Sequence, residues 1–386
     1  MIAADIGDFR ELARRRLPHF LFEYVDGGAF AETTLNRNLT DLRAIALRQR
    51  VMRDVSGIDL STTILGEKVA MPVALAPIGL AGMAARRGEV QAARAAQAAG
   101  VPFTLSMMSC CPVEEVRAGV GRPFWFQLYL MRDRGFAETM LARAQAAGTT
   151  TLLLTVDLPT HSMRYRELRS GMAGPQDLPV KIRRAVEALR HPHWLWDVGM
   201  LGRPHTLGNV ASMMEHGAEM TRFVAWVRRN VDATLTWKDV EWVRARWPGK
   251  LVVKGVLDPA DAVSAIGAGA DGVLVSNHGG RQLDGALSTI AALPAVVEAV
   301  AGRVPVLMDG GVRSGLDVVR AMALGASGVL LGRAWAFALA ARGGAGVAQM
   351  LELVRREMIV AMALTGCTRV SRIGRDTLVQ AGVQAA

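Results

Sequence analysis

The segment SNHGGRQLDG, residues 276–285, combines several residue types that do chemistry. Histidine is the side chain best suited to proton transfer near neutral pH, so His278 is a candidate general acid–base group. The two glycines after it let the backbone approach a ligand closely, and the planar guanidinium of Arg281 fits a carboxylate. We therefore expect proton transfer on a substrate that carries a carboxylate.

Three further residues could serve the same site. Asp157, in the run TVD, could hold His278 in one tautomer and stabilise its protonated ring, although aspartate is also a common helix N-cap. Arg164, a few residues later, could join the carboxylate site or lie solvated on the surface. Lys254 could stabilise an anion beside a cofactor ring, or form a Schiff base.

These residues lie in or just after short apolar runs of the kind expected for parallel strands buried on both faces. The runs cover residues 72–77, 102–106, 124–129, 151–157, 250–255, 271–277, 304–311 and 327–333. Helical stretches rich in Ala, Arg and Glu, such as 86–100 and 135–148, lie between them and end at glycine. Eight such units predict an α/β fold, a (β/α)8 TIM barrel rather than an open doubly wound sheet.

The chain has 386 residues, whereas a plain barrel needs about 250. The excess lies in two places. Residues 1–70 precede the first strand, and we expect them to form an N-terminal helical segment that closes the bottom or the edge of the barrel. An insertion of about residues 170–245 follows the fourth strand. No low-complexity linker separates two halves, so residues 1–386 are expected to form a single domain.

Active sites of such barrels lie at the C-terminal ends of the strands. The predicted strand ends carry polar or small residues, namely Pro77, Ser106, Gln127, Tyr129, Thr155, Asp157, Lys254, Ser276, His278, Asp309, Gly311, Gly332 and Arg333. The last two ends, DGGVRSG (309–315) and LGRA (331–334), are glycine-rich, and Arg313 and Arg333 add positive charge. This combination predicts a phosphate-binding site, and neither segment is a Walker A or Rossmann fingerprint.

The formal net charge of +10 indicates an anionic partner, and most of the basic excess lies in residues 161–260. Nucleic-acid binding is not expected, because it would depend on charge alone. No metal site is expected, since His191 and His193 lie far from any strand end. Arg190, with Trp194 and Trp196 nearby, fits either a membrane-surface patch or a solvated helical face. No signal peptide or membrane-spanning segment is expected, because prolines and glycines interrupt the uncharged stretch 69–85.

Several of these motifs occur in the same order in one known family. FEYVDGGA near residue 24, MPVALAPIG, the FQLY and TVD strand ends, VVKG, SNHGGRQLDG, DGGVRSG and LGR resemble the FMN-dependent α-hydroxy-acid dehydrogenases and oxidases. The resemblance covers nearly the whole chain. FLFEYVDGGAFAETTLNRN and DLRAIALRQRV are most similar to the respiratory L-lactate dehydrogenases of bacteria. Some members have tryptophan where this chain has Met107 and Met108, a difference that leaves the preferred substrate open.

The resemblance implies a role for each matching residue. His278 would be the base, with Asp157 supporting its protonated form. Arg281 and Tyr24 would hold the substrate carboxylate, and Tyr129 and Arg164 would also contact the substrate. The implied FMN-binding residues are Ser106, Gln127 and Thr155 at the flavin ring, Lys254 near its electron-rich edge to stabilise the reduced form, Asp309 at the ribityl chain, Gly311, Arg313, Gly332 and Arg333 at the phosphate, and Pro77 and Ser276 beside them.

The implied reaction is oxidation of an L-2-hydroxy acid, L-lactate to pyruvate in the first instance, with electrons passed from FMN to a membrane quinone. The alternatives are a dehydrogenase for L-mandelate or another 2-hydroxy acid, an oxidase that uses O₂, and, from a different class, a basic membrane- or nucleic-acid-binding protein built on a degenerate barrel. The resemblance further implies a homo-oligomer, a tetramer, in peripheral contact with the cytoplasmic face of the bacterial inner membrane.

Overall fold

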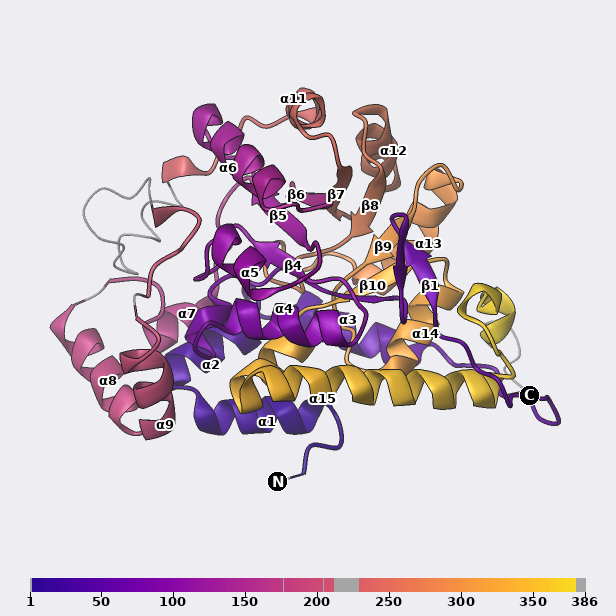
Figure 1. Ribbon diagram of the computed structural model, residues 1–386, viewed down its shortest axis with the longest axis horizontal. Helices are drawn as coiled ribbons and strands as arrows, with labels where there is room; N and C mark the ends of the chain where they lie inside the picture. Colours follow the sequence, from indigo (N-terminus) through magenta and orange to yellow (C-terminus); the bar gives the residue numbers. More distant parts are fainter. Residues whose placement is uncertain (1, 176, 204, 212–228, 380–386) are drawn as a thin grey trace.

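The computed structural model describes residues 2–175, 177–203, 205–211 and 229–379. At its centre lies a sheet of eight parallel strands in the spatial order β3-β10-β9-β8-β7-β6-β5-β4 (Figure 1). The strands are β3 (Val73–Leu75), β4 (Thr104–Ser106), β5 (Trp125–Tyr129), β6 (Thr151–Thr155), β7 (Lys250–Val256), β8 (Gly272–Val275), β9 (Val306–Met308) and β10 (Gly328–Leu331). A parallel bridge between Leu75 and Phe103 joins the two ends of the sheet. The predicted barrel is confirmed, and each of the eight apolar runs coincides with one strand.

The strands are apolar throughout because each of them packs on two sides. Leu153 of β6 points into the barrel, where it packs with Trp125 and Leu307 in an interior core. Leu152 and Leu154, its neighbours in the chain, belong instead to the core between the strands and the surrounding helices. Alternate side chains of one strand thus serve two separate cores, which is why no polar alternation is visible in the sequence.

One helix follows each strand of the barrel and covers its outer side. These helices are α4 (Gly88–Ala98), α5 (Val113–Gly119), α6 (Arg134–Ala146), α11 (Trp237–Arg246), α12 (Pro259–Gly267), α13 (Thr289–Val300), α14 (Gly315–Ala323) and α15 (Arg333–Thr365). The helices predicted at 86–100 and 135–148 correspond to α4 and α6. The long α15 crosses the base of the view in Figure 1, packed against α4, α14 and the N-terminal α1 (Ile6–Arg16).

The N-terminal segment is only partly helical. It contains α1, α2 (His19–Asp26) and α3 (Thr33–Ala44), and then an antiparallel hairpin of β1 (Thr62–Ile64) and β2 (Glu67–Val69). Ile64 and Leu65 of this hairpin join the interior core and lie against Gly328 and Gly272, the first residues of two barrel strands. A hairpin, not a helix, therefore closes the bottom of the barrel, and the expectation of helices throughout residues 1–70 is wrong at this point.

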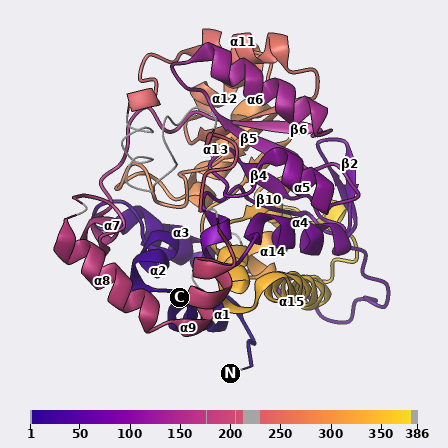
Figure 2. The same ribbon diagram turned by 60° about the vertical axis from the view of Figure 1, so that its left-hand side comes forward.

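The insertion lies between β6 and α11. It includes α7 (Tyr165–Ser170), α8 (Leu178–Leu189), α9 (Pro192–Trp194) and a π-helical turn, η2 (Leu195–Met200), and it flanks α1 and α2 (Figure 2). Residues 176, 204 and 212–228 of the expected insertion lie outside the described residues. The expected boundary near residue 245 is too late, because α11 packs beside α12 as one of the barrel helices. Within the described residues, no helix has the length and hydropathy needed to cross a bilayer.

Candidate active site

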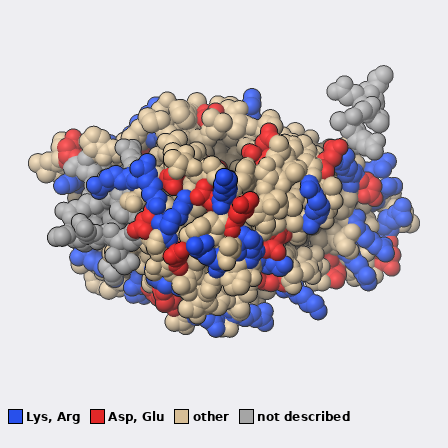
Figure 3. All heavy atoms as spheres, turned by 90° about the horizontal axis from the view of Figure 1, so that it is seen from above, with Lys and Arg blue, Asp and Glu red and all other residues tan. Residues whose placement is uncertain are grey.

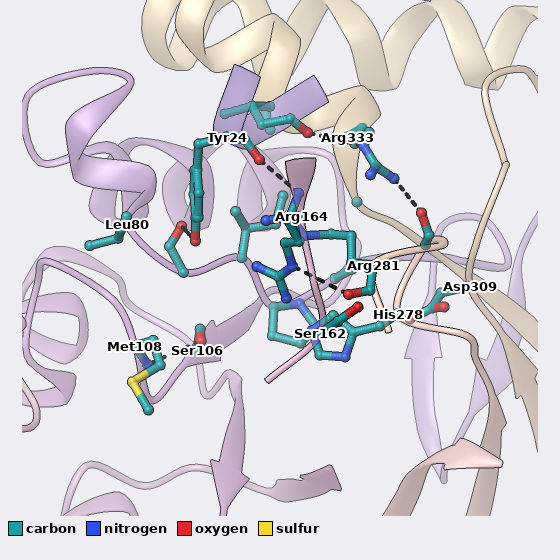
Figure 4. Close-up of a pocket in the computed structure, with 18 of the residues that line it drawn as sticks. Tyr24, Leu80, Ser106, Met108, Ser162, Arg164, His278, Arg281, Asp309 and Arg333 are labelled. Atoms are coloured by element: carbon teal, nitrogen blue, oxygen red, sulfur yellow. Dashed lines mark hydrogen bonds between the residues drawn. The ribbon is translucent and has the colours of Figure 1, made fainter. Parts of the chain in front are cut away.

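A cavity of about 290 Å³ lies at the C-terminal ends of the barrel strands (Figure 4). Fourteen of the predicted site residues line it, namely Tyr24, Pro77, Ser106, Tyr129, Thr155, Arg164, Lys254, His278, Arg281, Asp309, Gly311, Arg313, Gly332 and Arg333. The other three, Gln127, Asp157 and Ser276, lie directly behind the lining and hydrogen-bond to it. Tertiary structure therefore brings together residues that are more than 300 positions apart in the chain, from Tyr24 to Arg333.

His278 is held between an acid and a phenol. Its Nδ1 lies 3.0 Å from Oδ1 and 3.1 Å from Oδ2 of Asp157, and its Nε2 lies 3.3 Å from the hydroxyl of Tyr129. The φ angle of His278 is +57°, in the left-handed region, which is uncommon for a residue other than glycine. The hydroxyl of Ser276 accepts a hydrogen bond from the His278 N–H and helps to keep this conformation. The ring therefore presents Nε2 to the cavity with its other nitrogen bound to Asp157.

Burial favours the neutral form of His278. Burial lowers the pKa of His278, and the nearby Lys254 lowers it further, whereas Asp157 acts to raise it. For Asp157 itself, burial acts to raise the pKa, but the attraction of the protonated form of His278, the hydrogen bond from its ring and the charge of Lys254 hold it below the usual range. The pair therefore consists of a neutral imidazole and a carboxylate, which is the state that a general base needs before it takes up a proton.

Arg164 and Arg281 form a cationic group next to His278. The Arg164 Nε donates to the backbone oxygen of Arg281 at 3.2 Å, and the Arg281 guanidinium lies over the ring of Tyr24, 5.0 Å from its centroid (Figure 4). One nitrogen of Arg281, Nη1, donates to the carbonyls of Tyr24 and Gly27, at 2.7 and 2.8 Å. Arg281 is thereby fixed to the end of α2, and this end of the cavity suits a small carboxylate.

Lys254 and Asp309 form a buried ion pair deeper in the barrel mouth. The Lys254 Nζ lies 3.1 Å from Oδ2 of Asp309 and donates to the Ser276 hydroxyl at 2.7 Å. The second carboxylate oxygen of Asp309, Oδ1, is buried and has no hydrogen-bond partner among the described residues. A buried carboxylate oxygen is costly without a donor, so this position calls for a ligand hydroxyl.

Arg313 and Arg333 lie beside the glycine-rich ends of β9 and β10. Burial lowers the pKa of Arg313 to about 10, and it lowers the pKa of Arg333 well below its usual value, with the charges of Arg281 and Arg313 acting in the same direction. The Arg333 guanidinium donates to the carbonyls of Val25, Gly27 and Gly279, which leaves two of its five N–H groups for a ligand. An anion between these crowded cations would relieve their repulsion.

These observations fit FMN. Its ribityl hydroxyls would supply the missing donor to Asp309, and its phosphate would lie near Arg313 and Arg333. A hydrogen-bonded chain that runs from Ser106 through Gln127 to Thr155, with 3.0 Å at each step, offers polar atoms to the flavin ring. The cavity lining carries five basic side chains, Arg164, Lys254, Arg281, Arg313 and Arg333, and two carboxylates, Glu167 and Asp309. The resulting charge of +3 matches one phosphate dianion together with one substrate carboxylate.

Sequence reasoning did not find several residues of this site, among them Glu167, Gln282 and Leu80. Glu167, on α7, lines the cavity and bridges Arg164 and Arg281. Gln282 donates to the backbone oxygen of Asp157 at 2.7 Å and accepts a hydrogen bond from Arg164. Leu80, in the loop after β3, contributes apolar lining. Of these three residues, Glu167 alone had a signal in the sequence, its place three residues after Arg164 on a helix, where opposite charges meet. Of the two methionines singled out in the sequence, Met108 lines the cavity and Met107 is buried elsewhere.

Comparison with known proteins agrees with this geometry. Residues 13–380 match the family described as FMN-dependent dehydrogenase. An L-lactate dehydrogenase of Stenotrophomonas maltophilia is 57% identical over 379 residues, 98% of this chain and 99% of that protein. An L-lactate dehydrogenase of Caulobacter vibrioides is 59% identical over 380 residues, 98% of each chain. The crystal structure of the monotopic membrane protein (S)-mandelate dehydrogenase matches with a TM-score of 0.93 and 36% identity, covering 98% of this chain and 100% of that one. The chain belongs to the FMN-dependent dehydrogenase family, and FMN is its cofactor.

Proposed function

We propose that the protein oxidises L-lactate to pyruvate and passes the electrons to a membrane quinone. The observation that carries this proposal is the placement of the neutral His278 imidazole, backed by Asp157, beside the paired cations Arg164 and Arg281 in one small cavity. An acid–base group next to a carboxylate site suits a short 2-hydroxy acid. The L-lactate dehydrogenases at 57 and 59% identity support lactate as that acid.

In this reaction the protein positions the substrate and handles its proton. The substrate carboxylate binds between Arg281, Arg164 and the Tyr24 hydroxyl, which directs the hydroxyl-bearing carbon toward His278. The His278 Nε2 then takes one proton from the substrate, and Asp157 stabilises the imidazolium that forms. When bound, FMN supplies the two-electron oxidant. Tyr129, whose hydroxyl lies 3.3 Å from Nε2, orients the substrate oxygen next to the base.

The substrate and the acceptor are tested in two steps. Under anaerobic conditions, L-lactate is expected to bleach the flavin absorbance of the purified protein more efficiently, in kcat/KM, than glycolate or L-mandelate. After this reduction, a soluble quinone analogue is expected to reoxidise the flavin faster than O₂, with little hydrogen peroxide formed in air. Absence of bleaching by every 2-hydroxy acid would refute the proposed activity, and rapid peroxide formation would identify an oxidase.

A second candidate substrate is L-mandelate. Part of the cavity wall is apolar, with Met108, Met163, Leu168 and Met172 in its lining. Unbranched methionine side chains adapt to ligands of different shape, so this wall could admit an aromatic ring. The solved structures that match include (S)-mandelate dehydrogenase and mandelate oxidase. A kcat/KM for L-mandelate above that for L-lactate would favour this alternative.

The pH dependence tests the role of Asp157. Because burial lowers the pKa of His278, the low-pH decline of kcat/KM is expected below the usual histidine value of about 6.5. In Asp157→Asn the interaction that raises this pKa is lost, so the decline moves to still lower pH. The plateau is expected to fall by about 10²-fold or more, because the imidazolium loses its counter-ion. An unchanged profile would show that Asp157 does not act on the base.

The protein is further proposed to contact a membrane through α8. Leu178, Ile182 and Leu189 recur at helical spacing on one face of α8, and between 55 and 69% of each is exposed. Trp196 on the following turn is 65% exposed. Trp194, expected in this patch, is instead buried against Phe20 with its indole N–H bound to the Met83 carbonyl, so its assignment to the patch is wrong.

Charge supports the same surface. Lys181, Arg183 and Arg190 lie off the apolar face of α8, an arrangement typical of helices that lie on anionic lipid. By contrast, on the face formed by α6, α11 and α12, Lys and Arg alternate with Asp and Glu, and arginines of α6 and α11 form ion pairs (Figure 3). A homotetramer on the cytoplasmic face of the bacterial inner membrane, with no nucleic-acid partner, is the corresponding assembly that we propose.

Membrane contact predicts an effect of charge on α8. The double variant with Leu178→Glu and Leu189→Glu is expected to lose about tenfold or more of its binding to vesicles that contain phosphatidylglycerol, because two exposed leucines no longer enter the lipid. Anaerobic bleaching by L-lactate should be unchanged. The matched control replaces Val360 and Leu364 of α15, each 55% exposed, with glutamate. Equal loss of vesicle binding in both variants would contradict a specific role of α8.

A further inference from the structure

A carboxylate lies inside the cationic end of the cavity, where the substrate carboxylate is proposed to bind. The Glu167 Oε1 lies 2.7 Å from Nη2 of Arg281 and 3.2 Å from Nη1 of Arg164, so one oxygen bridges both guanidinium groups. The Glu167 side chain is 11% exposed and lines the cavity. Among the described residues that line the cavity, the other carboxylate is Asp309, which is engaged by Lys254.

The charge of this cluster determines which anions it can take up. Arg164 and Arg281 together with Glu167 carry a net charge of +1, which one carboxylate neutralises. A second carboxylate on the same ligand would remain as an uncompensated charge in a nearly buried site, where such a charge is costly. Burial and Arg164 lower the pKa of Arg281, and Glu167 opposes this effect, so the three groups act on one another.

We propose that Glu167 is a specificity-determining residue that restricts the site to substrates with a single carboxylate and excludes 2-hydroxy dicarboxylates. The inference depends on the proposed binding of the substrate carboxylate at Arg281 and Arg164. Glu167 does not react with the substrate. It occupies donors that a second carboxylate would otherwise use, and it supplies the negative charge that repels one.

In this cluster, one substitution can remove the charge of Glu167 without removing its hydrogen bonds. Glu167→Gln keeps an oxygen that can accept hydrogen bonds from both guanidinium groups and removes only the charge. Arg281 stays anchored by its bonds to the carbonyls of Tyr24 and Gly27. The matched control is Glu23→Gln, which makes the same charge change on α2, where Glu23 pairs with Arg166 outside the cavity lining.

The test measures anion binding to the FMN-loaded protein without turnover. Propanoate, with one carboxylate, and malonate, with two, are titrated while the flavin absorbance is followed. In Glu167→Gln the ratio of the propanoate Kd to the malonate Kd is expected to rise by about tenfold or more, since a unit charge acts over a few ångströms in a partly buried site. The same variant should gain kcat/KM for L-malate relative to L-lactate. Glu23→Gln should leave both ratios at the wild-type values.

Several outcomes overturn the inference. An unchanged ratio in Glu167→Gln, an equal change of affinity for both anions, or the same rise in Glu23→Gln would each show that Glu167 only positions α7 or acts through general charge. If Glu167→Gln does not retain FMN, Arg164→Gln provides the reverse change, and it must weaken malonate binding more than propanoate binding. Because the titration requires no turnover, failure of L-lactate to bleach the flavin would refute the proposed function and leave this test intact.

Discussion

Replacing His278 with glutamine is expected to leave FMN bound and to slow flavin reduction by L-lactate by about 10²- to 10⁴-fold. Glutamine cannot take up the substrate proton, whereas the groups proposed to hold the phosphate, Arg313 and Arg333, are unchanged. The Asp157 carboxylate, now 3.0 Å from the imidazole, would lose the cation that it stabilises during the reaction. Anaerobic stopped-flow absorbance measures the rate, and the FMN content of the purified variant is determined separately.

The backbone conformation of His278 makes a second substitution at this position necessary. Because His278 has a φ of +57°, glutamine adds strain, and asparagine tolerates this conformation better. His278→Asn should therefore be equally inactive and closer to wild type in its thermal unfolding temperature. His193→Gln, at an exposed position on α9, is the matched control and should reduce its flavin at the wild-type rate. Wild-type bleaching in both His278 variants would exclude His278 as the base.

Replacing Arg281 with lysine is expected to raise the KM for L-lactate by about 10²-fold or more, with a smaller fall in kcat. The guanidinium holds the Tyr24 and Gly27 carbonyls with one nitrogen and Glu167 with the other, and the substrate carboxylate is proposed to bind beside the second. A lysine ammonium cannot span both sets of partners. Steady-state kinetics with a quinone analogue measures KM and kcat.

The Arg281→Lys result has a structural component that must be separated. Loss of a donor to α2 is expected to lower the unfolding temperature, because the Tyr24 carbonyl loses its bond from Arg281, whereas the Gly27 carbonyl keeps the one from Arg333. Arg169→Lys, the same change on α7 where Arg169 stacks on Tyr165, is the matched control and should leave KM unchanged. A wild-type KM in a folded, FMN-loaded Arg281→Lys protein would show that the substrate carboxylate binds elsewhere.

The barrel could be predicted because its strands are buried on both faces. Leu152, Leu153 and Leu154 serve alternate cores, so the whole run must be apolar, and such a run is visible in sequence. The β1–β2 hairpin could not be predicted in the same way. Its strands are three residues long, too short to show the alternation of apolar and polar residues that is typical of a strand. Ile64 and Leu65 are buried only through their contact with the interior core of the barrel.

The residues of the candidate site could be predicted from the sequence for a similar reason. Parallel strands place their C-terminal ends on one rim, so residues at those ends, such as Lys254 and Asp309, are brought together by topology alone. Their pairing at 3.1 Å and the unpartnered Asp309 oxygen are consequences of packing. The residue type of Trp194 is not enough to place it, because a tryptophan suits either a membrane surface or a protein core. Its contact with Phe20 shows that it lies in the core.

The sequence alone therefore indicated the fold class, the strand ends and the proposed acid–base role of His278. These features could be predicted because every buried parallel strand needs the same apolar run, and each run ends on the same rim of the barrel. The tertiary structure alone determines which charged residues, far apart in the sequence, form ion pairs. The bridge from Glu167 to Arg281 joins residues 114 positions apart, and the Asp157–His278 pair joins residues 121 positions apart. These pairs form because the fold brings buried charged groups within hydrogen-bond distance of one another. A buried charge is costly unless a group of opposite charge lies next to it.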